Sequence, residues 1–262
     1  MDQRSLRTVA ATRYVTPFRE GGSLPGLVEA DDLGMYVLKF RGAGQGLKAL
    51  TAEIIVGELA RRLGFRVPEL VLVELHPELS RAEPDEEIQD LLRASAGQNL
   101  GVDYLPGSFD FNPRVRDPGR DLAARLLWFD TLVLNVDRSW RNPNMLLWHR
   151  QPWLIDHGAS LIFHHRWLPG WQPAAAYRYD ADDHVMMAAN PASLTDADAE
   201  LRPRVTPAVL DEVLTLVPDD WLDPGFGPPD QVRAAYRAYF TARLADAPSW
   251  VAALEETRAA RV

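Results

Sequence analysis

The segment from Leu134 to Gly158 constrains the fold of this chain more than any other stretch. It reads LNVDRSWRNPN, then a short apolar run MLLW, a turn HRQP, and finally WLIDHG. Two apolar runs separated by a turn predict one tight hairpin, which brings Asp137, Asn142 and Asp156 around a single strand–loop–strand element. Three oxygen-bearing side chains that converge in this way can hold a hard divalent cation beside a phosphate. Phosphoryl transfer is therefore the first functional hypothesis.

The composition is that of an ordinary globular protein. Its 262 residues are 47% apolar and 25% charged, which suffices for one large domain or two lobes with real cores. No apolar run is long enough to span a bilayer, and the first residues, MDQRSLRTVA, lack the pattern of a signal peptide. The absence of cysteine excludes disulfides and thiolate metal sites. We therefore expect a cytoplasmic protein with no membrane partner.

Charge argues against a nucleic-acid partner and draws attention to the two lysines. The net charge is −9, whereas a broad nucleic-acid footprint is normally basic. Lysine and arginine total 28, of which only Lys39 and Lys48 are lysines, leaving 26 arginines (28 − 2). A lysine retained in such a chain suits a place that needs a compact point charge; chance is the competing explanation. The acidic run 180–184 (DADDH) can bind a cation, but a solvated loop is more typical.

The spacing of apolar residues predicts strands in the first part of the chain and helices in the second. Runs rich in β-branched and aromatic residues predict strands at 8–18, 24–30, 35–40, 70–75 and 98–105. Helical periodicity predicts helices at 47–63, 86–92, 121–134, 206–217 and 229–260. A linker is predicted at 106–119, and a long ordered loop with short helical turns at 159–203. The sequence thus predicts an α+β fold divided into 1–105 and 106–262.

The loop after the helix predicted at 121–134 carries the first candidate catalytic group. Asp137 can orient a hydroxyl nucleophile and accept its proton, although an isolated aspartate more often caps a turn. Asn142 follows five positions later and can offer a neutral oxygen to a cation. Asn144 is a second candidate ligand, but its place after a proline is typical of a turn residue.

The second apolar run of the hairpin leads to Asp156, followed by His157 and Gly158. The Asp156 carboxylate can face a cleft and supply a charged oxygen to the same cation; an ordinary strand end is the alternative. His157 has no partner histidine at a metal-binding spacing. We therefore expect His157 to pack behind the site.

Lys39 lies inside a predicted strand and points to the opposite face from Leu38 and Phe40. Exposure at a sheet edge is the usual outcome for such a lysine, but its ammonium can instead reach an α- or β-phosphate. The second interpretation requires a carboxylate that holds the lysine in place. Glu53 on the following helix is the first choice, and Glu58 is the second, because the sequence leaves the helix register open.

The turn Gly21-Gly22-Ser23 separates two predicted strands. Glycines let backbone N–H groups approach anions, so this turn can fold over phosphates. Two glycines between strands more often make a simple hairpin turn.

In their order along the chain, these segments resemble the protein-kinase-like fold, and most closely the HipA-like and phosphoinositide kinases. The resemblance rests on the glycine turn, the lysine strand, the glutamate helix, the D-R-x-x-x-N form at Asp137 and the D-x-G ending at Asp156. The segments GGSLPG and AEIIVGELARRLGFRVPEL are similar to the HipA-like group in particular. The resemblance covers about residues 13–165. It implies two lobes, the first with an antiparallel sheet and one helix, the second mainly helical.

Carried over by position, the resemblance implies a role for each candidate residue. Asp137 would be the catalytic aspartate, Asn142 and Asp156 the magnesium ligands, Lys39 the phosphate-binding lysine and Glu53 its ion-pair partner. Gly21, Gly22 and Ser23 would cover the phosphates, and the hinge around Val102 and Tyr104 would meet adenine through its backbone. The implied cofactors are ATP and Mg²⁺.

Two positions depart from the family pattern. These kinases usually carry a histidine two residues after the catalytic aspartate, where this chain has Ser139, and a phenylalanine where it has His157. The resemblance suggests a protein serine or threonine as the phosphate acceptor, and a small-molecule acceptor is the alternative. Trp167 and Trp171 follow the hairpin where kinases place substrate-facing loops, and they suit either a docking surface or core packing.

Two other classes of protein remain as alternatives. A kinase-like fold that binds nucleotide without turnover has no need of all four polar residues at 39, 137, 142 and 156, yet the missing histidine leaves room for it. A dinucleotide-binding oxidoreductase is suggested by Gly42, Gly44 and Gly46 after a strand. The dinucleotide-binding fingerprint requires its third glycine at the position of Leu47, and it requires its strand at the start of the fold. This chain meets neither requirement.

Overall fold

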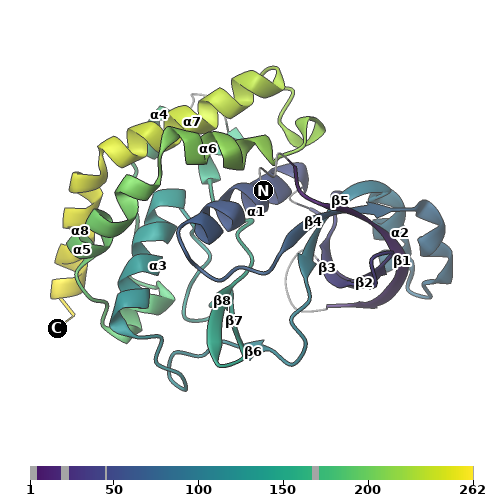
Figure 1. The fold of residues 1–262 in the computed structure, drawn as a ribbon, viewed down its shortest axis with the longest axis horizontal. Coiled ribbons are helices and arrows are strands. Elements are labelled where there is room, and N and C mark those ends of the chain that lie inside the picture. Colours follow the sequence, from purple (N-terminus) through teal and green to yellow (C-terminus); the bar gives the residue numbers. More distant parts are fainter. Residues whose placement is uncertain (1–4, 19–23, 45, 167–170, 262) are drawn as a thin grey trace.

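The computed structural model describes residues 5–18, 24–44, 46–166 and 171–261. The first part of the chain builds a barrel of five strands in the order β1-β2-β3-β5-β4 (Figure 1). These strands are β1 (Thr8–Pro17), β2 (Gly26–Ala30), β3 (Met35–Lys39), β4 (Leu70–Leu75) and β5 (Gly97–Asp103). All five predicted strands are present.

A parallel strand pair closes the barrel, which corrects the antiparallel sheet that the sequence predicted. The first residues of β1 pair in parallel with β4, from Thr8–Leu72 to Ala10–Glu74. The later residues of β1 pair antiparallel with β2, from Ala11–Ala30 to Pro17–Gly26, with register shifts after Ala11 and after Tyr14. A ten-residue strand that is bent in this way can pair on two sides and close the sheet.

The barrel interior is filled by apolar side chains, because alternate residues of a strand point to the same face. The buried cluster takes its members from every strand except β5, and from a helix that covers one end: Val9, Val28, Ala30, Tyr36, Leu38, Phe40, Val71, Val73, Leu75, Ile88 and Leu92. Strand β5 contributes Gly101 opposite Val71. A Cβ at this glycine would lie 2.5 Å from Val73 Cγ2 and 2.8 Å from Val71 Cγ2. The crowded interior therefore excludes a side chain at position 101.

Helix α1 (Gly46–Arg62) joins the barrel to the rest of the molecule. Its residues from Leu50 to Ala60 are buried, including Glu53 and Glu58. The large core continues from α1 through strands β4 and β5 into the helices that follow. The helix predicted at 47–63 is thus confirmed, and its position fixes the orientation of Glu53 toward the barrel.

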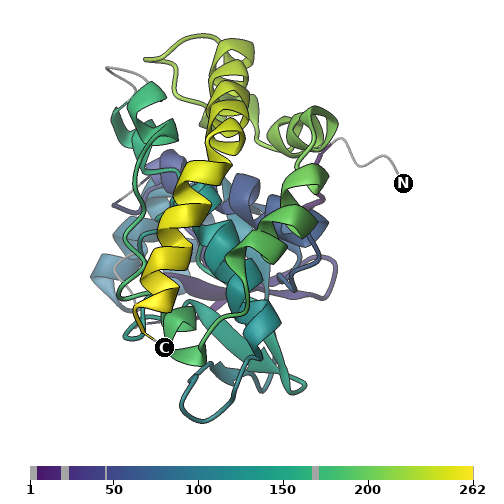
Figure 2. The same cartoon turned by 90° about the vertical axis from the view of Figure 1, so that its left-hand side faces the viewer.

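The later part of the chain is mainly helical and lies to one side of the barrel (Figure 1). Its larger helices are α3 (Arg120–Val133), α5 (Leu194–Leu201), α6 (Pro207–Thr215), α7 (Pro229–Ala245) and α8 (Ala247–Ala259). The other helices of the chain are α2 (Glu86–Ala94), α4 (Gln172–Ala175), η1 (Pro77–Ala82), η2 (Ile162–Arg166), η3 (Val185–Ala189), η4 (Arg202–Arg204) and η5 (Asp219–Trp221). In Figure 2, which faces the side opposite the barrel, α7 and α8 cross the front of the molecule. None of the described helices has both the length and the apolar character that crossing a membrane would need.

A second, three-stranded sheet contains the predicted hairpin. It consists of β6 (Phe109–Asp110), β7 (Met145–Trp148) and β8 (Gln151–Leu154). Residues 106–119 are therefore more than a linker, because β6 pairs with β7 through Phe109–Leu147.

The single helix predicted at 229–260 is wrong, because the chain breaks there into α7 and α8. Asp246 both ends α7 and precedes α8. Pro248 lies in the first turn of α8, where its missing N–H is tolerated, whereas inside a continuous helix it would clash with the preceding turn.

We expect Gly101→Ala to lower the free energy of unfolding by about 1–3 kcal/mol, because the added methyl group overpacks the barrel. Urea unfolding measures this difference. Gly44→Ala is the matched control, since a Cβ there has no neighbour within 4 Å. Equal stability of the two variants would contradict the packing described for the barrel interior.

Candidate functional site

A lysine and two carboxylates from distant parts of the chain meet beside the barrel. Lys39, the last residue of β3, donates to Oε1 of Glu53 and to Oδ1 of Asp156, the latter at 2.6 Å. Side-chain exposure is 14% for Lys39 and 3% for Glu53, but 53% for Asp156. The cluster is therefore closed on the side of α1 and open at the aspartate. The predicted Lys39–Glu53 ion pair is confirmed, while Glu58 pairs with two arginines of its own helix.

Burial and mutual attraction set the charges of this cluster. Burial acts to lower the pKa of Lys39, but attraction to Glu53 and Asp156 outweighs it and raises that pKa above its usual value. Attraction to Lys39 lowers the pKa of Asp156 to about 2, against the effect of burial. Burial raises the pKa of Glu53, and the nearby lysine offsets only part of this rise. The open end of the cluster thus presents an ammonium and an ionised carboxylate.

The chain turns sharply after β8, and this turn brings Asp156 to Lys39. Asp156 has a φ of 57°, in the left-handed region that residues with a Cβ adopt at a cost. The N–H of Gly158 donates to Glu53 Oε1 at 2.8 Å, and a Cβ at Gly158 would lie only 3.1 Å from that oxygen. Glycine at position 158 therefore lets the backbone approach the buried carboxylate closely.

Asp137 lies in the loop between α3 and β7, where two amides hold its carboxylate. Asn142 and Asn144 both donate from Nδ2 to Asp137 Oδ2, at 2.9 and 3.1 Å. The carbonyl of Asn144 accepts the N–H of Ile155 at 3.1 Å, directly beside Asp156. Asn144 has a left-handed φ of 47° directly before β7, and it joins the two halves of the predicted site.

A buried ion-pair network lies beneath this loop and was not predicted. Asp130, on α3, accepts a hydrogen bond from Arg138 Nε at 2.6 Å and lies 2.9 Å from His184 Nε2. Asn135 donates to the other Asp130 oxygen at 3.2 Å and accepts the backbone N–H of Asp137 at 3.2 Å. Burial acts to raise the pKa of Asp130, but Arg138 and His184 outweigh it and lower that pKa. The network therefore holds the backbone of Asp137 in place through Asn135.

His184 comes from the acidic run 180–184, for which a solvated loop was the favoured interpretation. That interpretation is wrong for His184, whose residue exposure is only 5%. The backbone of His184 also bridges to Ser139, the position at which the sequence lacks the expected loop histidine. One signal in the sequence could have found the network: Asp130 is the one charged residue in the mostly apolar stretch LLWFDTLVL, and a buried carboxylate needs partners.

His157 is buried behind the site, so the predicted packing role is confirmed. Its Nδ1 lies 3.4 Å from a terminal nitrogen of Arg138. Burial, followed by repulsion from Arg138, lowers the pKa of His157 to about 3. The imidazole is therefore neutral near neutral pH.

The remaining predicted residues lie elsewhere or cannot be placed. Val102 is in β5, between Val37 and Leu70, and the N–H of Tyr104 donates to Met35 O at 3.0 Å. Gly21, Gly22, Ser23 and Trp167 lie outside the described residues. Trp171 packs partly buried against the large core.

Asn142 and Asp156 offer the oxygen ligands that a hard cation prefers. Asn142 uses Nδ2 on Asp137, and its Oδ1 makes no hydrogen bond with the described residues. Asp156 contributes a half-exposed, ionised carboxylate. Among the described residues, no group of three or more His, Cys, Asp or Glu side chains is arranged to hold a metal ion. A cation here would consequently need further ligands from substrate and water.

Comparison with known proteins agrees with this geometry. The model of the HipA-like kinase family matches residues 12–226. The kinase CtkA of Helicobacter pylori has a similar structure, with a TM-score of 0.52, 12% identity, and coverage of 94% of both chains. The Golgi casein kinase, solved with Mn/ADP bound, gives a TM-score of 0.51 and 13% identity over 95% of this chain and 72% of its own. A search of the curated proteins finds no match.

The family match spans most of the chain, so this protein belongs to the HipA-like kinase family. The two structural likenesses show a protein-kinase-like fold with mixed helices and sheets. The protein is accordingly a phosphotransferase of the kinase type.

We expect His157 to make the protein less stable in mild acid. Its folded-state pKa of about 3 lies below its ordinary value of 6.5, so the unfolded chain binds the proton first and stability falls as the pH drops below about 6.5. This one group should cost about 2 kcal/mol between pH 7 and pH 5. His157→Phe removes the titration and should flatten the slope by that amount in urea unfolding at the two pH values.

The exposed histidine variant His149→Asn is the matched control, because asparagine tolerates the left-handed φ of 47° at that turn. A slope in His157→Phe as steep as that of the parent would show that His157 is not held neutral by its surroundings.

Proposed function

We propose that the protein transfers the γ-phosphoryl group of ATP to a hydroxyl group, with Mg²⁺ as cofactor. The supporting observation is the meeting of Lys39, Glu53 and Asp156 beside the loop that carries Asp137. We further propose a two-lobed division, with a nucleotide-binding lobe at 1–105 and a helical catalytic lobe at 106–262. Lys39 comes from the first and Asp156 from the second, so the nucleotide lies between them.

Each residue then has a distinct part in the transfer. The ammonium of Lys39, held by Glu53, binds the α- and β-phosphates, and the raised pKa of Lys39 keeps it charged. Asp137 orients the acceptor hydroxyl and accepts its proton, with one carboxylate oxygen fixed by two asparagine amides. Transfer of this kind depends on positioning more than on covalent chemistry, so the rigid support under Asp137 matters as much as the carboxylate itself.

Asn142 and Asp156 are the proposed magnesium ligands, and the metal would neutralise charge on the phosphates. The Golgi casein kinase structure contains manganese and ADP, which supports the use of a divalent metal with nucleotide here. Asp156 also accepts a hydrogen bond from Lys39, so the same carboxylate would hold the metal and contact the lysine.

The adenine contact is proposed for the backbone around Val102 and Tyr104. Because the Tyr104 N–H is already bonded to Met35, the Tyr104 carbonyl is the group that would face adenine. Gly21, Gly22 and Ser23 are proposed to cover the phosphates through backbone N–H groups.

A protein serine or threonine is the acceptor that the surface supports best. Val136 and Trp140, on either side of Asp137 and Arg138, are 55% and 50% exposed. The guanidinium of Arg141 lies 4.3 Å from the Trp140 ring centroid and holds this ring in place. An exposed aromatic beside the catalytic group suits the side chains of a polypeptide segment better than a small polar molecule.

We expect Asp137→Asn to abolish phosphate transfer while ATP binding survives. The amide keeps the size of the carboxylate but cannot accept the hydroxyl proton, which should slow transfer by about 100-fold to 10,000-fold. Incubation with labelled ATP and Mg²⁺, followed by mass spectrometry of the protein and of cell-extract proteins, measures transfer. A thermal shift with ATP measures binding.

The matched control is Asp121→Asn, which changes an exposed carboxylate in the first turn of α3. Full activity in Asp137→Asn would refute the role of Asp137. No transfer and no nucleotide-induced thermal shift in the parent protein would refute the kinase activity itself. Nucleotide binding without transfer in the parent would favour the non-catalytic alternative.

A further inference from the structure

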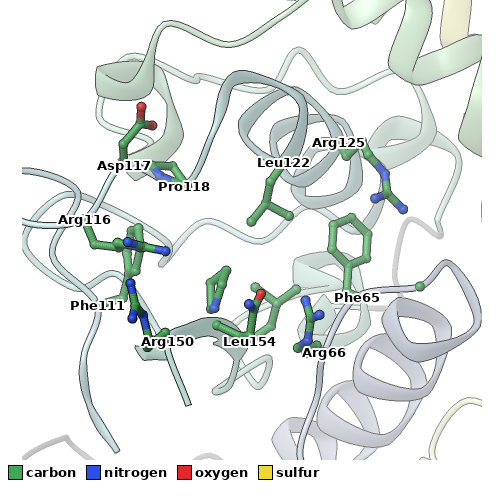
Figure 3. A pocket seen from close by; sticks show the side chains of 13 residues that line it. Phe65, Arg66, Phe111, Arg116, Asp117, Pro118, Leu122, Arg125, Arg150 and Leu154 are labelled. Atoms are coloured by element: carbon green, nitrogen blue, oxygen red, sulfur yellow. The ribbon is translucent and has the colours of Figure 1, made fainter. Parts of the chain in front are cut away.

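Four arginines line a hollow of about 260 Å³ that shares no residue with the proposed nucleotide site. They come from separate segments: Arg66 after α1, Arg116 before α3, Arg125 on α3 and Arg150 in the turn between β7 and β8. Figure 3 shows Arg116 and Arg150 on one side of the hollow, with Arg66 and Arg125 on the other. Such convergence is unusual in a chain with a net charge of −9.

Most of this positive charge is not neutralised within the described residues. Arg66, Arg116 and Arg150 form no salt bridge and no side-chain hydrogen bond there, whereas Arg125 lies 3.3 Å from Glu200. Asp117 is the one carboxylate in the lining. It accepts the Gly119 N–H at 2.8 Å, and its carboxylate points away from the hollow in Figure 3. Like charges that gather without counter-charges repel one another, and a bound anion removes that cost.

The base of the hollow is apolar. Phe65, Phe111 and Leu154 line it and are almost wholly buried. Arg125 lies over the Phe65 ring at 5.2 Å, and the Arg66 carbonyl accepts the Leu154 N–H at 2.8 Å. A ligand that fills the hollow therefore needs an apolar portion in addition to its charge.

The turn at Arg150 adds a second indication. His149 and Arg150 have φ values of 47° and 64°, the left-handed pair of a two-residue hairpin turn that asparagine and glycine usually occupy. An arginine at such a position accepts a backbone cost, and here its guanidinium is placed at the hollow.

We propose that this hollow binds a phosphomonoester. A phosphate monoester carries a charge of about −1.5 to −2 at neutral pH. One guanidinium group can donate two parallel hydrogen bonds to two of its oxygens. The hollow has room for a phosphate and a small organic group. It is smaller than the pockets of about 300–1,000 Å³ that usually enclose larger ligands, so we do not expect it to hold a whole nucleotide. Two sources share this chemistry, a free phosphorylated metabolite and a phosphorylated side chain of a protein.

The test is a titration of the full-length protein with phenyl phosphate, followed by NMR of the arginine Nε–H signals. We expect saturable shifts at Arg66, Arg116, Arg125 and Arg150. Arg116→Gln and Arg150→Asn should each weaken binding about tenfold or more, as loss of a charged hydrogen bond predicts. Asparagine suits the left-handed turn at position 150, so the fold should survive, and thermal unfolding checks this.

Arg114→Gln is the matched control, because Arg114 is exposed on the same loop and does not line the hollow. Asp137→Asn should bind phenyl phosphate as the parent does, so failure of the proposed transfer and failure of this site are distinguishable. Tighter binding of a phosphoserine peptide than of phenyl phosphate would assign the site to phosphorylated protein, and the reverse order would assign it to a free metabolite.

Two results would overturn the proposal. One is the absence of saturation below about 10 mM phenyl phosphate. The other is equal affinity for inorganic phosphate and phenyl phosphate, because the apolar base would then contribute nothing.

Discussion

The ion cluster of Lys39, Glu53 and Asp156 is the interaction on which the rest of the structure depends. It joins the last residue of a barrel strand, a buried helix and the turn that follows the hairpin. A carboxylate as buried as Glu53 is costly unless it is paired and hydrogen-bonded, and it receives both Lys39 and the Gly158 N–H. Loss of Lys39 would leave the Glu53 carboxyl group buried without a counter-charge. The residues that serve the proposed chemistry are thus the same residues that fix the parts of the fold against one another.

A second buried network supports the catalytic loop in a different way. Asp130 holds Arg138, His184 and Asn135, and Asn135 in turn holds the backbone of Asp137. The loop lacks the histidine that related kinases carry within it, yet a histidine from a distant segment reaches the carboxylate beneath it. Several hydrogen bonds to one buried carboxylate make its position well defined. The catalytic loop is therefore supported from beneath by a residue that lies outside the loop in the sequence.

The end of the hairpin contributes to both proposed sites. Leu154, at the end of β8, lines the arginine hollow, and Asp156 follows two residues later in the ion cluster. The segment from Leu154 to Asp156 thereby contributes to both the proposed phosphomonoester site and the proposed nucleotide site. In the first site the lysine is already paired with two carboxylates. In the second, Arg125 is paired with Glu200, whereas Arg66, Arg116 and Arg150 form no salt bridge among the described residues and leave positive charge for an additional anion.

The sequence alone determined the strands, most of the main helices and the order of the kinase motifs, because these depend on local periodicity and short spacings. It left the partner of Lys39 open between Glu53 and Glu58, and the fold decided for Glu53. It did not determine the closure of the barrel, since that depends on which strands a long, bent β1 can reach. The sequence also did not predict that the last helix divides into α7 and α8, or that His184 contacts Asp130, 54 residues away. The partners of a buried charge are the groups that lie near it in three dimensions. The sequence therefore indicates that Asp130 needs partners, but only the tertiary structure shows which residues they are. The four arginines of the hollow are likewise unremarkable along the chain and become a site only where the fold brings them together.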